Sequence, residues 1–243
     1  MNNRRRLYYP AVAYASLLLL VWLLSWVVDI AELLTGGGDV VSSLLSAEGV
    51  RWAVRGASLS LTSAPWGVIV SGVSLAGLVM GAGVTKSIRA LSVGKVLMPN
   101  ERRAWLFAFV TALVFGALLL LGTLAPWSVL LGVTGNFNAS PLMQGAVFLF
   151  FAGGVLVFSV YGFIYGNYRS VVDVALSMGE GFSFFAPALL AVLPATGILP
   201  CVEFSGLFSM VGVSVEELAV VADVMYLLPF LFVLLMHYAE GKR

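Results

Sequence analysis

Six long stretches of the chain are strongly apolar and almost free of charge, and each is about 20 residues long, the length with which an α-helix crosses a bilayer. They are residues 10–28, 65–84, 104–125, 141–165, 182–199 and 218–237. Their apolar residues run on without the period-two alternation of a membrane β-barrel strand. The sequence therefore predicts an all-α fold: a polytopic membrane helix bundle of about six transmembrane helices, forming one transmembrane domain over 1–243.

The composition excludes an ordinary soluble domain. Hydrophobic residues make up 60% of the chain and charged residues 10%, against about 45–50% and about 25% in soluble domains. Lys and Arg number 13 and Asp and Glu 12, so the chain lacks the basic excess that nucleic acid requires. Although Arg4, Arg5 and Arg6 precede the first stretch, it is longer than the apolar core of a signal peptide. We expect an uncleaved first span.

Two connectors and one span are less regular. Residues 48–62 and 170–179 read as amphipathic helices, or equally as ordinary connectors. The stretch 182–199 contains Pro187 and Pro194, each of which removes a backbone hydrogen bond. It is therefore predicted either to span the membrane as a broken helix or to re-enter as a pair of segments bent at Pro194.

The basic residues indicate an orientation, because cytoplasmic loops retain Lys and Arg. With six spans and both termini in the cytoplasm, Arg51 and Arg55 are the two basic residues outside, and the remaining 11 of the 13 lie inside. The inside set is Arg4, Arg5, Arg6, Lys86, Arg89, Lys95, Arg102, Arg103, Arg169, Lys242 and Arg243. This bias predicts a multi-pass protein of a prokaryotic inner or plasma membrane, with the lipid bilayer as its first partner.

Residues that carry chemistry are few. His237, the single histidine, lies at the end of the last stretch, where it is expected to anchor the helix at the interface. Cys201 is the single cysteine, and no metal-ligand or cofactor motif is present. We therefore expect no enzyme, no metal site and no cofactor.

Polar side chains inside the stretches are the remaining candidates. Asp223 is a carboxylate within a predicted span, which marks either a functional site or a position at headgroup level. Several hydroxyls are placed at depth, and such groups usually bond to their own helix. They are Ser71, Ser74, Thr111, Ser159 and Thr196.

Two pairs of glycines have the spacing that lets helices pack closely. Gly77-x-x-x-Gly81 lies in the second stretch and Gly162-x-x-x-Gly166 at the end of the fourth. Small residues four positions apart form a shallow face that a second helix approaches. They predict helix packing within the chain or a homodimer.

Three blocks of sequence together resemble the AbgT family of p-aminobenzoyl-glutamate transporters. The first comprises Ser43-Leu-Leu-Ser-Ala-Glu-Gly-Val-Arg-Trp52, Thr62-Ser-Ala-Pro-Trp-Gly-Val68 and Met80-Gly-Ala-Gly-Val-Thr-Lys-Ser87. The second comprises Pro99-Asn-Glu-Arg-Arg-Ala104 and Ser140-Pro-Leu-Met-Gln-Gly145. The third comprises Tyr161-Gly162, Arg169-Ser-Val-Val-Asp-Val174 and Met178. The blocks follow the family's order and together cover more than half of the chain.

The resemblance implies an ion-coupled transporter of p-aminobenzoyl-glutamate or a related aromatic or dicarboxylate anion, with Asp223 and Pro229 as substrate-binding residues. Family members are longer and are built as inverted repeats with two re-entrant hairpins. Here Ser87 passes almost directly to the Pro99 block, and Val220 stands where the family has an arginine. The alternative is therefore a truncated, non-transporting scaffold or accessory subunit of the same family.

Overall fold

A computed structural model describes residues 7–35, 41–53, 64–94, 96, 98–124, 141–207 and 215–240. Its principal helices are α2 (Tyr9–Thr35), α4 (Trp66–Ala82), α5 (Val84–Ser92), α6 (Pro99–Leu124), α7 (Pro141–Gln144), α8 (Ala146–Tyr165), α9 (Val171–Ser205) and α10 (Val215–Glu240). No strand occurs among these residues. Five helices are long and apolar enough to cross a membrane, and a bent pair, α4 with α5, makes up to six. The predicted all-α membrane fold is confirmed.

The helices differ from the predicted segments at two places. The connector over 170–179 and the stretch 182–199 form one helix, α9, of 35 residues. It runs through Pro194 without interruption, because proline is tolerated where neighbouring groups satisfy the freed carbonyls. Of the predicted helix over 48–62, residues 47–53 are helical, and 54–62 lie outside the described residues.

The backbone packs as two compact units, and α9 contributes to both. Unit 1 comprises Met1–Pro65 and Phe185–Arg243, and unit 2 comprises Trp66–Phe184. Each unit has a buried apolar cluster of its own. The single domain over 1–243 stays a prediction, and the units are described separately.

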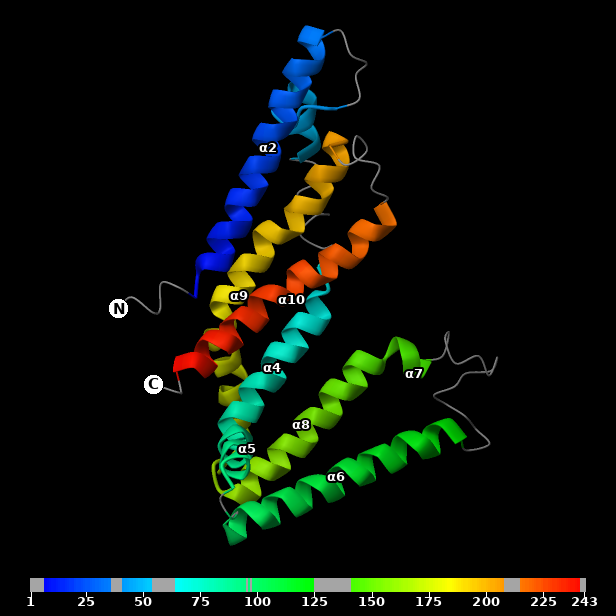
Figure 1. Ribbon diagram of the computed structural model, residues 1–243. Coiled ribbons are helices and arrows are strands. Elements are labelled where there is room, and N and C mark those ends of the chain that lie inside the picture. The colour runs from blue at the N-terminus through cyan, green and yellow to red at the C-terminus, as the bar shows by residue number, and fades with distance from the viewer. Residues whose placement is uncertain are drawn as a thin grey trace. The chain divides into compact units, whose positions relative to one another are not determined.

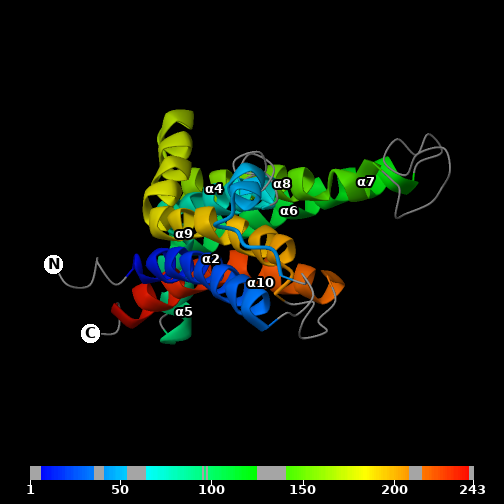
Figure 2. The same ribbon diagram turned by 90° about the horizontal axis from the view of Figure 1, so that it is seen from above.

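Unit 1 contains α2, the second part of α9 and α10, which run side by side in both ribbon views (Figures 1 and 2). Trp22 Nε1 donates a 3.4 Å hydrogen bond to Cys201 Sγ between α2 and α9. Tyr14 Oη donates to the carbonyl of Met225 at 2.9 Å and joins α2 to α10. Because α2 contacts both neighbours through polar atoms, its orientation about its own axis is fixed.

The segment 41–53 is held against α2 and α9 by its backbone. Leu44 is fully buried, and its N–H donates to Ser25 Oγ at 3.1 Å. The N–H of Ser42 donates to the carbonyl of Ser205 at 3.1 Å. Ser46 Oγ accepts the N–H of Gly49 at 3.0 Å, which is the hydrogen bond of a helix N-cap. The Ser43–Trp52 part of the first family-like block thus lies in unit 1.

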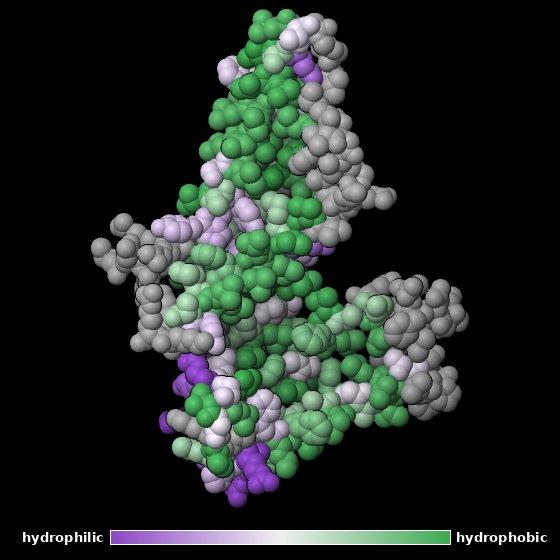
Figure 3. Space-filling model, in the orientation of Figure 1, coloured by the Kyte–Doolittle hydropathy of each residue, from purple (hydrophilic) through white to green (hydrophobic). Residues whose placement is uncertain are grey.

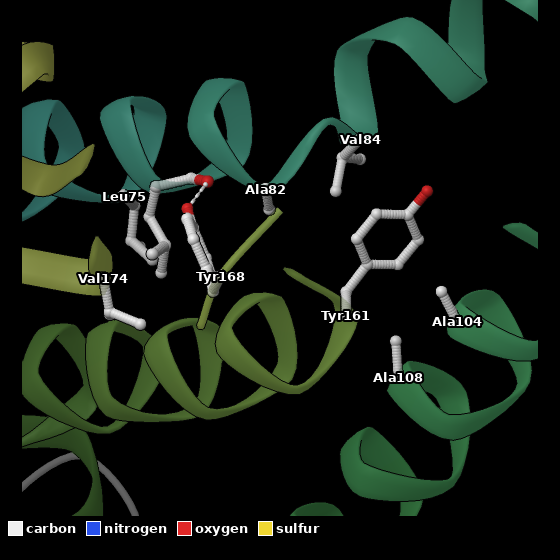
Figure 4. Close-up of a cluster of buried hydrophobic side chains, with 9 residues drawn as sticks. Leu75, Ala82, Val84, Ala104, Ala108, Tyr161, Tyr168 and Val174 are labelled. Carbon is white, nitrogen blue, oxygen red and sulfur yellow. Dashed lines mark hydrogen bonds between the residues drawn. The ribbon is translucent and has the colours of Figure 1, made fainter. Parts of the chain in front are cut away.

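Unit 2 is built around a buried cluster contributed by α4, α5, α6, α8 and the start of α9. Tyr161 of α8 lies between Val84 of α5 and Ala104 and Ala108 of α6, whereas Tyr168 points towards α4 (Figure 4). The small side chains of Ala104 and Ala108 leave room for the ring of Tyr161, which is fully buried. The cluster therefore fixes the end of α8 against three other helices.

The backbones of α4 and α9 approach closely because both lack side chains at the contact. A Cβ on Gly77 would meet the carbonyl of Ser177 and would lie 2.6 Å from the nitrogen of Gly181. A Cβ on Gly181 would lie 2.9 Å from the Cα of Gly77. The Gly77-x-x-x-Gly81 motif thus faces a second small motif, Ser177-x-x-x-Gly181, within the same chain.

We expect Gly77→Ala to destabilise the protein, because the backbones of α4 and α9 must move apart to admit the methyl group. Overpacking of this kind costs about 1–3 kcal/mol. Gly72→Ala is the matched control, since the Cβ position at Gly72 has open space and alanine is the better helix former. The measurement is the thermal unfolding midpoint in detergent. Equal midpoints for the two variants would contradict the close contact.

Candidate functional site

A group of polar contacts in unit 2 lies where α4 turns into α5. The two helices meet at an angle of 68°, and Gly83 between them has φ +89°, a left-handed conformation that glycine adopts without steric cost. A Cβ at Gly83 would lie 2.8 Å from Asn167 Nδ2 and 2.9 Å from the ring of Tyr165. Both the conformation and the space therefore require glycine at this bend.

Two side chains from the turn between α8 and α9 bond to the last carbonyls of α4. Tyr168 Oη donates to the carbonyl of Leu78 at 2.9 Å (Figure 4), and Asn167 Nδ2 donates to the carbonyl of Gly81 at 3.0 Å. Burial raises the pKa of the Tyr168 phenol, which keeps it a neutral donor. The end of α4 is thus satisfied by partners about 90 residues away in sequence.

A chain of hydrogen bonds connects α5, α6 and α8. The hydroxyls of Ser87 and Tyr161 are 2.7 Å apart, and both residues are fully buried. Ser87 Oγ donates to Glu101 Oε1 at 3.3 Å, which leaves its oxygen able to accept a hydrogen bond from the hydroxyl of Tyr161. Figure 1 shows the end of α8, the start of α6 and α5 close together. A partly exposed carboxylate is thereby linked to a buried phenol.

Glu101 also caps the N-terminus of α6. Its Oε2 accepts the N–H of Met98 at 2.9 Å, and Pro99 opens the helix. Glutamate at the third helical position, bonded back to the residue before the helix, is one half of a capping box, and proline is favoured at the first position. The second family-like block therefore has a local structural role as well as its contact with Ser87.

Trp105 lies one turn beyond Glu101 on α6. Its ring contacts Tyr161 edge-on, with centroids 5.4 Å apart and planes at 69°. Trp105 Nε1 is buried and has no hydrogen-bond partner among the described residues. The site thus presents one unmet donor beside an otherwise complete chain of hydrogen bonds.

An apolar cavity of about 540 Å³ lies between α6 and α8. Its volume is within the range of about 300–1,000 Å³ that is typical of ligand pockets. Figure 3 shows hydrophobic side chains along both helices around this hollow. Its lining consists of Ala112, Phe115, Gly116, Leu119, Leu142, Met143, Ala146, Leu149, Phe150, Gly153, Gly154, Val157 and Phe158. With no polar side chain in its lining, the cavity suits an apolar group and offers nothing to a carboxylate.

The predicted substrate residues lie on α10 in unit 1, in different environments. Asp223 is exposed and stands third in the apolar segment Val221–Ala239, whereas Pro229 is fully buried. The two residues lie six positions apart on the same helix. Their role in substrate binding stays a prediction.

Most of the hydroxyls predicted at depth bond to their own helix. Ser74 Oγ donates to the carbonyl of Val70 at 2.8 Å, and Thr196 Oγ1 to that of Leu193 at 2.8 Å. Ser71 and Thr111 donate in the same way to carbonyls three and four residues earlier. These groups are therefore occupied within the helices that carry them.

The predicted glycine positions have three different surroundings. Gly81 and Gly77 pack against α9, and Gly162 lies against the ring of Tyr168. Gly166 has φ +95° and caps α8, donating its N–H to the carbonyl of Gly162 at 3.1 Å. A dimer through these glycines stays a prediction, and the Gly77 face is already occupied by α9.

Sequence reasoning assigned no role to Asn167, Tyr168, Ser177 or Gly181, although all four contact α4. For Ser177 and Gly181, the sequence did offer a signal: two small residues four positions apart can predict a close helix contact. The described residues contain no group of three histidines, cysteines or carboxylates that could hold a metal ion. The expectation of no metal or cofactor remains a prediction for the whole chain.

A scan against protein-family models, a search of the curated proteins and a search of the solved structures each return no match to this chain.

We expect Tyr168→Phe to lower the unfolding midpoint, because it keeps the ring but removes the hydrogen bond from Tyr168 Oη to the carbonyl of Leu78. A hydrogen bond of this kind contributes about 0.5–1.5 kcal/mol to stability. Tyr9→Phe is the control, since the side chain of Tyr9 is 59% exposed. Thermal unfolding in detergent measures both. A Tyr168→Phe protein as stable as the Tyr9→Phe protein would show that this hydrogen bond is dispensable.

Proposed function

We propose that this chain is an AbgT-like integral membrane transporter for small organic anions of the p-aminobenzoyl-glutamate type, driven by a coupled ion. One observation carries the proposal: residues of the separate family-like blocks meet in unit 2. Gly83 of the first block bends α4 towards α5, and Ser87 bonds to Glu101 of the second block and to Tyr161 of the third. Residues 74 positions apart thus form one contact network.

The proposed setting is the inner or plasma membrane, with both termini in the cytoplasm. Five to six apolar helices support a multi-pass protein. The basic residues favour the orientation, because Lys86, Arg89, Arg102 and Arg103 all fall at the α5–α6 end of unit 2, and cytoplasmic loops are enriched in cations.

A second candidate function is a non-transporting scaffold or accessory subunit that acts as a homodimer. The observation that favours it is the shortage of free polar groups at depth. Apart from tyrosines, every buried polar side chain among the described residues is a serine or threonine. A charged solute requires groups that replace its hydration, and the apolar lining of the α6–α8 cavity supplies none.

Reconstitution in liposomes distinguishes the two functions. For a transporter, we expect proton- or sodium-driven uptake of p-aminobenzoyl-glutamate, and we expect Asp223→Asn to reduce it at least tenfold, because the substitution removes the carboxylate implied by the resemblance. Glu48→Gln is the matched control, since Glu48 is also an exposed carboxylate. If the Asp223→Asn and Glu48→Gln proteins both took up substrate as fast as the wild type, Asp223 would have no role in transport. No uptake by a folded, dimeric wild-type protein would support the scaffold.

The orientation is tested by cysteine labelling in intact cells. A membrane-impermeant maleimide is expected to modify Arg51→Cys from outside and to modify Arg89→Cys only after permeabilisation, because the two exposed positions are predicted on opposite sides. The wild-type protein is the background control, since Cys201 is buried. Equal labelling of both variants in intact cells would refute the proposed topology.

A further inference from the structure

Helix α5 is amphipathic, and its apolar side continues from the core of unit 2 to the protein surface. Val84 and Ser87 are buried, and Ile88 and Leu91 follow them on the same side at spacings of three and four residues. Ile88 is 52% exposed and Leu91 is 49% exposed. The same helix side thus begins in contact with protein and ends without protein cover.

Cations occupy the other side of α5. Lys86 and Arg89 are three residues apart and both are exposed, and neither has an ion pair within the described part of the chain. The start of α6 adds Arg102 and Arg103, which are exposed as well. The hydrogen bond from Ser87 to Glu101 holds this turn of α6 beside α5.

Glu101 is the single carboxylate of α5 and the first two turns of α6, and both its oxygens are occupied. Oε1 accepts from Ser87 and Oε2 from the N–H of Met98. The four basic residues of these two helix segments, less this one carboxylate, leave three positive charges in excess. Figure 3 shows hydrophilic side chains gathered at the α5–α6 end, in contrast with the hydrophobic flanks of α6 and α8.

The bend at Gly83 gives α5 the geometry of an interfacial helix. Because α5 departs from the axis of α4 by 68°, an α4 that crosses the bilayer directs α5 along its surface. A helix in this position buries its apolar side at the level of the first acyl carbons and presents its cations to the headgroups. Basic clusters on amphipathic helices beside a membrane span attract anionic lipids.

We infer that Lys86, Arg89, Arg102 and Arg103 bind the phosphate headgroups of anionic phospholipids whose acyl chains contact Ile88 and Leu91. We name these six residues the α5 lipid surface. Charge complementarity selects the headgroup, and the exposed apolar pair favours a lipid over free phosphate. The inference is independent of transport, because it uses only the position of α5 at the edge of a membrane span.

The test uses the full-length protein purified in a neutral detergent. Phosphatidylglycerol or phosphatidylcholine is titrated in, and the bound lipid is counted by native mass spectrometry. We expect a clear preference for phosphatidylglycerol that weakens as salt is raised. Each surface cation contributes about a fivefold gain in affinity, so Lys86→Gln with Arg89→Gln should lower phosphatidylglycerol binding about 25-fold.

Three controls show whether a change in binding is due to the charges of the α5 lipid surface. Lys86→Arg with Arg89→Lys keeps the charges and should retain binding, whereas Arg51→Gln removes an exposed cation outside the surface and should change nothing. Inorganic phosphate at the lipid's concentration should not displace it. Equal binding of the two lipids, an unaffected Gln variant, or displacement by phosphate would each overturn the inference.

Discussion

Every backbone polar group in an apolar surrounding needs a partner, and this constraint explains the arrangement of unit 2. Helix α4 stops at Ala82, so its last four carbonyls lack an intrahelical donor. Asn167 supplies one for the carbonyl of Gly81, and Tyr168 adds a second donor to the carbonyl of Leu78. Gly166 places these two residues by ending α8 in a left-handed conformation. The same requirement operates in unit 1, where Ser25 accepts the buried N–H of Leu44. At the bend of unit 2, long-range polar contacts are thus concentrated where helices end.

The glycine contacts and the hydrogen-bond chain depend on one another. Close approach of α4 and α9 at Gly77 and Gly181 brings the start of α9 against α4, which positions the preceding Tyr168. The bend that follows α4 then directs Ser87 to Glu101 and Tyr161. The proposed transport function and the α5 lipid surface both rest on this bend, although they use different side chains around it.

Apolar runs in the sequence predicted the helices, because length and hydropathy decide what crosses a bilayer. The motif at Gly77 predicted a close helix contact. Its spacing could not identify α9 as the partner, because a helix face made of small residues can pack against any other such face. The prolines of α9 favoured a break that the helix does not have, because local preference yields to surrounding contacts. Tyr168 and Asn167 were unpredictable for a further reason: no periodicity connects a turn to a carbonyl about 90 residues earlier.

The early end of α4 has a consequence for bilayer thickness. Its 17 residues rise about 25 Å at ~1.5 Å per residue, whereas an average hydrocarbon core measures about 30 Å. Helices α6 and α10, with 26 residues each, exceed that thickness. Such unequal lengths are accommodated by tilt of the long helices and by thinning of the lipid around the short one. A thin membrane therefore suits the α4 side of unit 2 better than a thick, sterol-rich one.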